Sequence, residues 1–344
     1  MPDRATTIVL GAYTDDTHPN GLRTLALDET TGQMAITAEY PVSNALYQAF
    51  SPDGQILYSC MGRGLASFRA ENARLTKIDE AEIGICVCHV AALPDGEHVV
   101  FADYLGGFAG SVQVTEGHFG EIVRHQHRGS GPNLPRQNAA HCHQALPTPD
   151  GKSYCVVDLG MDEIVTYPEQ RVFKTLPAGA GPRHLLFHPN GRLAFLVSEL
   201  GNLVTSLRWS AADGFAPIDT LPTLPPGDTG RGANGDLAAA IRFTPGEKCV
   251  VVSNRGENSL AVYDFDETTG RMHLKARTLL PGDWPRDFAF VNDTLALVAL
   301  ERSGKILSLR YDADSGEFKT VSSLTGLFRP VALTPIRKGQ STWT

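Results

Sequence analysis

Short apolar stretches recur along the chain, and each is followed by a tight turn and a second apolar stretch. The turns have the form Pro-Asp/Asn-Gly, as in FSPDGQILYSC from Phe50, LPTPDGKSYCVVDLG from Leu146 and LFHPNGRLAFLVSEL from Leu186. Alternating apolar positions are typical of half-buried strands, and Asp or Asn beside Gly favours a hairpin turn. The pattern therefore predicts a β-hairpin in each unit.

The hairpins form a repeat of seven units, counted by the residue that marks each turn. These residues are Pro52, Pro94, Pro149, Pro189, Pro245, Asn292 and Pro335. Successive turns lie 42, 55, 40, 56, 47 and 43 residues apart. A period of about 40–50 residues with strands in every unit is typical of a β-propeller and not of a helical solenoid. We therefore expect an all-β, seven-bladed β-propeller of four-stranded antiparallel blades, with residues 1–344 forming a single domain.

The two ends of the chain supply complementary parts of one unit. The last unit, from Val331, has a first strand and a turn only, whereas TTIVLGAYT from Thr6 is a second strand without a first. Ring closure removes the exposed strand edges that an open array would leave. We therefore expect both chain ends to complete the terminal blade together.

Composition and charge restrict the partners and the compartment. The net charge is −8, and the 344 residues contain no run of Lys or Arg of the kind that marks a nucleic-acid binder. No apolar run approaches the ~18 residues that cross a bilayer, and the N-terminus does not resemble a signal peptide. Six cysteines in such a chain indicate reduced thiols. We expect a cytoplasmic monomer or weak homodimer that binds neither nucleic acid nor membranes.

Candidate site residues occupy equivalent positions in the repeats. The residues six positions before each turn are Leu46, Cys88, His143, Arg183, Ala239, Arg286 and Arg329. The regions after the second strands contribute Arg63, Tyr104, Asp158, Glu199, Arg255 and Glu301. If the first strand of each blade lines the channel, these side chains meet at one opening, where clustered arginines need water, carboxylates or an anionic ligand. The insertions 129–141 and 222–236 are expected to wall the same opening.

Several segments carry a family resemblance that spans essentially the whole chain. They are AGAGPRHLLFHPNG from Ala178, HCHQALPTPDG from His141, SNRGENSLAVY from Ser253 and WPRDFAF from Trp284. The chain thereby resembles the bacterial 6-phosphogluconolactonase family of seven-bladed propellers, which also includes a fungal carboxymuconate cyclase. The resemblance implies a metal-free lactonase that acts on a phosphorylated sugar lactone and needs no cofactor. One departure is His-Cys-His-Gln from His141, where the family usually has Gly-Cys-His-Ser or similar.

The residues that match the family's suspected site suit lactone hydrolysis. His143 is the candidate general base, because histidine titrates near neutral pH. Glu199 could orient that histidine or activate the water itself, and Arg183 and Arg255 could stabilise the oxyanion. Arg286 could hold a phosphate or carboxylate. The further candidates for substrate binding are His141, His184 and Arg329.

Other chemistries stay open or are disfavoured. A cyclase or cycloisomerase could use the same cleft, and a propeller could also bind ligands or proteins without catalysis. The segments Cys86-x-Cys88-His89 and His141-Cys142-His143 could converge on a metal, but their spacing matches no structural zinc pattern. No Gly-x-Ser-x-Gly motif indicates a serine nucleophile. We therefore expect no metal, and a small anionic or sugar lactone as the substrate.

Overall fold

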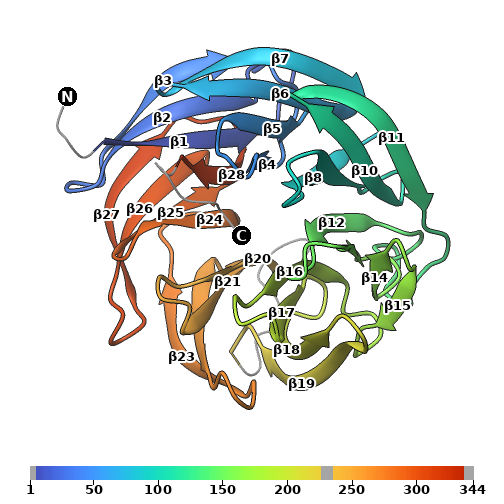
Figure 1. Cartoon of the computed structure of the whole chain (residues 1–344). Coiled ribbons are helices and arrows are strands. Elements are labelled where there is room, and N and C mark those ends of the chain that lie inside the picture. Colours follow the sequence, from blue (N-terminus) through green and yellow to red (C-terminus); the bar gives the residue numbers. More distant parts are fainter. Residues whose placement is uncertain (1–4, 226–234, 337–344) are drawn as a thin grey trace.

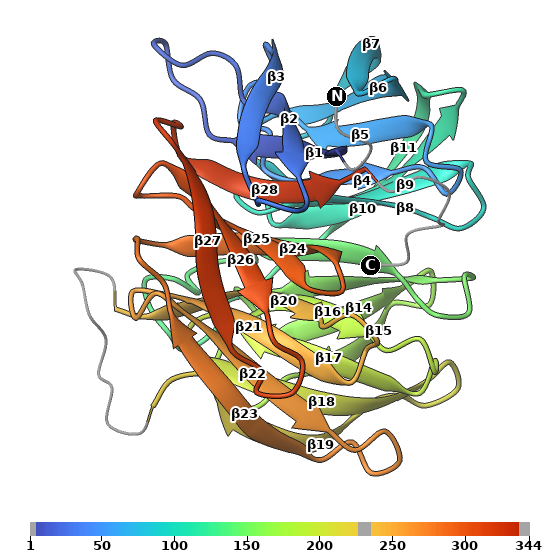
Figure 2. The same ribbon diagram turned by 90° about the vertical axis from the view of Figure 1, so that its left-hand side faces the viewer.

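Each repeat of the sequence folds into a four-stranded antiparallel sheet, and seven such sheets surround a common axis (Figure 1). The computed structural model describes residues 5–225 and 235–336. In the side view, neighbouring sheets pack face to face as the blades of a propeller (Figure 2). The predicted seven-bladed β-propeller is confirmed.

The strands of the seven blades fall into four concentric sets. The innermost strands are β4 (Gln48–Phe50), β8 (Val87–Ala92), β12 (Cys142–Pro147), β16 (Pro182–Phe187), β20 (Leu237–Phe243), β24 (Pro285–Asn292) and β28 (Pro330–Pro335). The second strands are β5 (Ile56–Cys60), β9 (His98–Asp103), β13 (Tyr154–Asp158), β17 (Leu193–Ser198), β21 (Cys249–Arg255), β25 (Leu295–Leu300) and β1 (Ala5–Ala12). The third strands are β6 (Gly64–Glu71), β10 (Phe108–Thr115), β14 (Glu163–Tyr167), β18 (Leu203–Ser210), β22 (Ser259–Phe265), β26 (Lys305–Tyr311) and β2 (Leu22–Asp28). The outer strands are β7 (Arg74–Glu82), β11 (His118–Gln126), β15 (Arg171–Lys174), β19 (Gly214–Pro222), β23 (Met272–Leu279), β27 (Phe318–Thr325) and β3 (Met34–Tyr40).

The core lies between neighbouring blades. Second strands such as β17 and β21 are buried along their whole length, whereas the outer strands are largely exposed. Phe288 and Val298 of one blade, for example, share a cluster with Val251 and Val262 of the preceding blade. Both faces of these second strands are therefore covered by apolar side chains, which explains the nearly continuous apolar runs in the sequence.

The two ends of the chain close the ring, as expected from the incomplete terminal units. β1 pairs antiparallel with β28, so that Leu10 lies opposite Leu333 (Figure 1). A glycine is required where β1 meets the next blade, because a Cβ atom on Gly11 would lie 2.0 Å from the carbonyl oxygen of Ala45. Closure thus depends on backbone-to-backbone packing between blades as well as on strand pairing.

One rim of the disc gathers the ends of many strands. In an antiparallel blade the start of the inner strand and the end of the second strand lie at the same edge. The connections that precede β12 and follow β17, for example, therefore meet at this rim. Within the described ranges, no helix has the length and apolar character needed to cross a membrane.

Candidate active site

A pocket opens on the axis at the rim where the inner strands begin. Its lining residues are Leu46, Tyr47, Cys88, His143, Arg183, His184, Arg286, Asp287 and Val331. Five of them are among the seven positions that the sequence predicts to be equivalent. The prediction that these distant residues meet at one opening is therefore confirmed for Leu46, Cys88, His143, Arg183 and Arg286.

A recurrent β-bulge presents these side chains to the pocket. In β12, Cys142 pairs with Asp158 and Gln144 pairs with Val157, so His143 is the extra residue. The same interruption occurs around Cys88 in β8, Arg183 in β16 and Arg286 in β24. A bulge re-aims a side chain and ends regular pairing, and such irregularities are common beside active sites. The repeat therefore supplies several neighbouring positions where a side chain can point into the channel.

In the last blade, the residue that faces the pocket does not lie six positions before the residue that marks the turn. In β28 the extra residue is Val331, which lies four positions before Pro335 and lines the pocket. The assumption that Arg329 is equivalent to Arg183 is therefore wrong for this blade. Arg329 lies just before β28 instead, with its side chain 48% exposed at the rim.

Glu199 is the centre of the charged group, because three arginines bind its carboxylate. Nε of Arg183 lies 3.0 Å and Nη2 of Arg255 lies 2.8 Å from Oε2, whereas Nη2 of Arg136 lies 2.5 Å from Oε1. Arg183, Arg255 and Glu199 are almost inaccessible to solvent. Three of the predicted catalytic residues thus lie together at the end of β17, the start of β16 and the end of β21.

The group carries more positive than negative charge. Burial would raise the pKa of Glu199, but Arg255, Arg183 and Arg136 outweigh it and hold that pKa well below its usual range. Burial and the neighbouring charge of Arg255 lower the pKa of Arg183 to about 9. Three cations around one carboxylate leave an excess that an anionic ligand would neutralise.

Backbone carbonyls of β20 hold the two buried arginines in place. Nη1 of Arg183 donates to the carbonyl oxygen of Ala239 at 2.6 Å, and Nη2 of Arg255 donates to that of Ala238 at 2.9 Å. These carbonyls are near the break in strand pairing between Ala238 and Ile241. Ala239, one of the seven repeat positions, therefore contributes its backbone carbonyl to an arginine of the preceding blade.

His143 lies beside this group within a cluster of rings. Its ring packs edge-on against His184 and Tyr104, with centroids 5.2 Å and 5.6 Å apart. Burial, together with the charge of Arg183, holds the pKa of His143 well below its usual range, so the ring is neutral at pH 7. Among the described residues, His143 and Glu199 share no hydrogen bond. The suggestion that Glu199 orients the imidazole therefore gains no support from this geometry.

A second carboxylate organises Arg286 and Arg329. Glu301 accepts from Nη1 of Arg286 at 3.4 Å and from Nη2 of Arg329 at 2.5 Å. Both guanidinium groups also lie over the ring of Tyr13, at 5.4 Å and 4.0 Å from its centroid. These two predicted binding residues therefore share a second carboxylate, Glu301, near the starts of β24 and β28.

His141 and His184 differ in their surroundings. His141 stacks on Tyr104 with ring centroids 4.5 Å apart, and its Nδ1 is 2.9 Å from the Tyr104 carbonyl oxygen. It lies at the rim and is absent from the pocket lining. His184 is buried in the pocket wall, where burial and Arg183 keep its pKa well below the usual range.

Sequence reasoning missed two parts of the site. Arg136 comes from the insertion 129–141, which confirms that this loop walls the opening. Below the pocket, Nη2 of Arg242 donates to Oη of Tyr47 at 3.0 Å and to Oδ1 of Asp287 at 2.9 Å. A charged residue inside an otherwise apolar first strand was the available signal for Arg242. Much of the other insertion, 222–236, lies outside the described residues.

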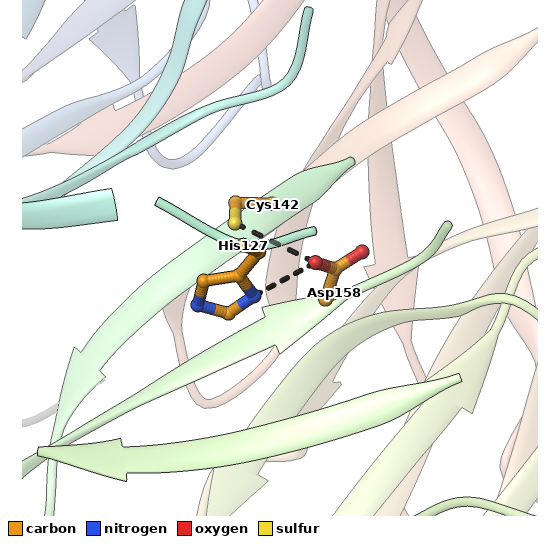
Figure 3. Close-up of side chains that lie close together, drawn as sticks. All are labelled: His127, Cys142 and Asp158. Atoms are coloured by element: carbon orange, nitrogen blue, oxygen red, sulfur yellow. Dashed lines mark hydrogen bonds and ion pairs between the residues drawn. The ribbon is translucent and has the colours of Figure 1, made fainter. Parts of the chain in front are cut away.

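One buried cluster has residue types that can bind a metal (Figure 3). Nδ1 of His127 lies 2.8 Å from Oδ2 of Asp158, and the thiol of Cys142 lies 3.7 Å from the same oxygen. Nε2 of His127 is 2.9 Å from Oη of Tyr167, while Oδ1 of Asp158 accepts from the backbone N–H of His141 at 2.8 Å. A metal would have to displace these hydrogen bonds, so the cluster fits best as an anchor for the loop before β12.

The cysteines nearest the pocket also have protein partners or buried surroundings. Sγ of Cys88 lies 3.4 Å from the carbonyl oxygen of His143. Burial is the main cause of the raised thiol pKa of both Cys86 and Cys88. Protonated thiols are poor metal ligands and poor nucleophiles. The Cys86/Cys88 pair therefore fits a packing role beside the site.

Proteins of known sequence or structure share both the repeats and the fold of this chain. A family model described as "Lactonase, 7-bladed beta-propeller" matches residues 7–334. A 6-phosphogluconolactonase of Bacillus subtilis is 29% identical over 309 residues, which are 85% of this chain and 87% of that protein. An uncharacterized protein of Lactococcus lactis is 32% identical over 90% of this chain and 93% of its own. The periplasmic gluconolactonase PpgL of Pseudomonas aeruginosa shares the fold, with a TM-score of 0.90 at 24% identity over 97% of this chain and 99% of that one. The chain therefore belongs to the lactonase family of seven-bladed β-propellers.

Proposed function

We propose that the protein hydrolyses a sugar lactone that carries an anionic group, with 6-phospho-D-glucono-1,5-lactone as the foremost candidate. The observation that carries the proposal is the surplus of buried arginines beside a neutral histidine. The named relative from Bacillus subtilis supports the same substrate class. No metal is required by the residues of the proposed reaction.

The charge at the opening contrasts with the charge of the whole chain. Six arginines surround three carboxylates there: Arg136, Arg183, Arg242, Arg255, Arg286 and Arg329 with Glu199, Glu301 and Asp287. The chain as a whole has a net charge of −8. A local positive potential of this kind attracts an anionic ligand to the channel against the overall field. A phosphorylated lactone fits such an opening better than a neutral sugar.

His143 and Arg183, which line the pocket, supply the groups that each step of the proposed hydrolysis needs. A water molecule adds to the lactone carbonyl carbon while His143 accepts its proton. Arg183, which lines the pocket, stabilises the resulting oxyanion, and Arg255 helps to hold the Glu199 carboxylate that positions Arg183. When the bond between that carbon and the ring oxygen breaks, protonated His143 returns the proton to the ring oxygen. Lactone and water thus become a hydroxy acid with no other reactant.

The test is acid release from 6-phosphogluconolactone and from gluconolactone by the purified protein, with and without a chelator. We expect turnover that exceeds spontaneous hydrolysis, persists in the chelator and is lost in His143→Gln. Loss of activity in the chelator would overturn the metal-free reaction. Inactivity on both lactones would overturn the lactonase proposal and favour a cyclase or a binding propeller.

A further inference from the structure

The insertion before β12 is firmly attached at the point where Arg136 leaves it. The neighbouring Gln137 is fully buried, and its Nε2 donates to the carbonyl oxygen of Leu159 at 2.8 Å and to Oδ1 of Asp162 at 2.9 Å. Nδ2 of Asn133 also donates to the carbonyl oxygen of Gly179 at 3.1 Å. The backbone of the loop is therefore fixed above the opening, and the Arg136 side chain alone spans the distance to Glu199.

Arg136 differs from the other two partners of Glu199 in exposure. Its side chain is 38% exposed, whereas the side chains of Arg183 and Arg255 are 3% and 4% exposed. Only its Nη2 is engaged, with Glu199 at 2.5 Å and with Oη of Tyr104 at 3.3 Å. Its Nε and Nη1 have no hydrogen-bond partner among the described residues. Part of a guanidinium group is therefore available to a ligand that enters the opening.

The three arginines do not all bind the same oxygen of Glu199. Arg183 and Arg255 both bind Oε2, and Arg136 is the partner of Oε1. Departure of Arg136 would leave Glu199 in place, because the two buried arginines still hold it. It would also free one carboxylate oxygen and remove one positive charge from the group beside His143.

We propose that Arg136 is a specificity-determining residue that exchanges Glu199 for the anionic group of the substrate and thereby frees Oε1 of Glu199. This inference rests on the proposed lactonase function and deepens it. Glu199 keeps two buried arginine partners when Arg136 leaves, and the exposed side of Arg136 can bind a phosphate through two charge-assisted hydrogen bonds. The exchange is therefore favourable for a phosphorylated lactone and does not occur for a neutral one.

The exchange would change the site as well as bind the substrate. Burial lowers the pKa of His143, as do the charges of Arg183, Arg286 and Arg255, whereas Glu199 raises it. Arg136 acts on Glu199 itself. With Arg136 bound to phosphate, the carboxylate acts on His143 with one cation fewer, which strengthens the base. Only substrates that withdraw Arg136 gain this effect, so phosphate recognition raises kcat as well as lowering KM.

The variants Arg136→Ala and Arg136→Lys test the proposal when kcat and KM are measured on both lactones. We expect Arg136→Ala to lose about 10- to 100-fold in kcat/KM on the phosphorylated lactone, and much less on the unphosphorylated one. Arg136→Lys should recover part of the loss. Arg128→Ala, which removes an exposed arginine at the start of the same connection, is the matched control and should leave both substrates unaffected.

Phosphite dianion, added to the reaction with unphosphorylated lactone, tests separately whether a dianion bound at Arg136 increases turnover. It should increase turnover by the wild type and have no effect on Arg136→Ala. Equal losses on both lactones in Arg136→Ala would overturn the inference and indicate a structural tether, while the lactonase function would stand. If the wild type hydrolyses neither lactone, calorimetry decides separately: 6-phosphogluconate should bind the wild type at least about 10-fold more tightly than it binds Arg136→Ala, and equal affinities would refute the role of Arg136.

Discussion

Arg183 and Glu199 are neighbours at the joined ends of β16 and β17, where Nε of Arg183 lies 3.0 Å from Oε2 of Glu199. The contact exists because Arg183 is the extra residue between the pairs that Pro182 and His184 form with β17. Both side chains are about 3% exposed. The two members of this buried pair are nevertheless not equivalent, because Glu199 is the shared partner of three arginines, whereas Arg183 is one of those three.

Substitution of Glu199 should therefore cost more stability than substitution of Arg183. Glu199→Gln leaves three cations without their carboxylate, which we expect to lower the free energy of unfolding by about 3–5 kcal/mol. Arg183→Met leaves Glu199 with two cations and removes repulsion with Arg255. Its main cost is the unpaired carbonyl oxygen of Ala239, about 1–3 kcal/mol. Unfolding in guanidinium chloride measures both changes.

An exposed ion pair provides the control for this comparison. Lys77 and Glu80 form a pair in which both side chains are about half exposed. Lys77→Met should change the free energy of unfolding by less than about 1 kcal/mol. If Arg183→Met proved as damaging as Glu199→Gln, the surplus of positive charge would not be the dominant property of the group.

The success and the limits of the sequence predictions have physical causes. The fixed spacing before each turn placed His143, Arg183 and Arg286 together because every blade builds the same hairpin around the same axis. It misplaced Arg329, because Pro335 is not a turn residue: it pairs with Ile8 inside β28, as Pro147 pairs with Tyr154 in β12. Arg136 could not be predicted, since the position of a side chain on an insertion depends on how that loop docks and not on the repeat.

The pH dependence of catalysis follows from the surroundings of His143. Burial and Arg183 hold its pKa well below the usual range, so the ring stays neutral and able to accept a proton throughout pH 6–8. After subtraction of spontaneous hydrolysis, kcat/KM on the lactone should be level across this range and fall only in more acidic solution. An inflection near pH 6.5 would contradict this environment for the base.

The charge of Arg183 also affects the pH at which the acid limb of kcat/KM lies. Arg183→Met removes the cation that lowers the pKa of His143, so the limb should shift toward neutral pH even though the residual rate is lower. The position of the limb, and not the rate, is the quantity compared between the wild type and the variant. A limb that stays in place would mean that the charge of Arg183 does not contribute to the proton affinity of His143.

His89 should make the folded state sensitive to acid. Its ring is buried against Tyr47, with centroids 4.0 Å apart, and burial followed by the charges of Arg242 and Arg183 lowers its pKa to about 3. The unfolded chain binds a proton at His89 below about pH 6.5, whereas the folded protein does so only near pH 3. The free energy of unfolding therefore falls as the pH decreases from 6.5 toward 3, and His89 alone accounts for a loss of about 2 kcal/mol at pH 5.

His89→Phe tests this contribution because the variant keeps an aromatic ring beside Tyr47 but cannot titrate. Guanidinium unfolding at pH 8 and pH 5 should show a loss of stability that is about 2 kcal/mol smaller in the variant than in the wild type. His143 and His184, whose pKa values are lowered by the same kind of burial, still act in the same direction in both proteins. His273→Ala, at a side chain 79% exposed, is the control and should follow the wild type. If His89→Phe also followed the wild type between pH 8 and pH 5, the buried ring would have to take up its proton in the folded state, and the channel beside Arg242 would be more accessible to water than its packing indicates.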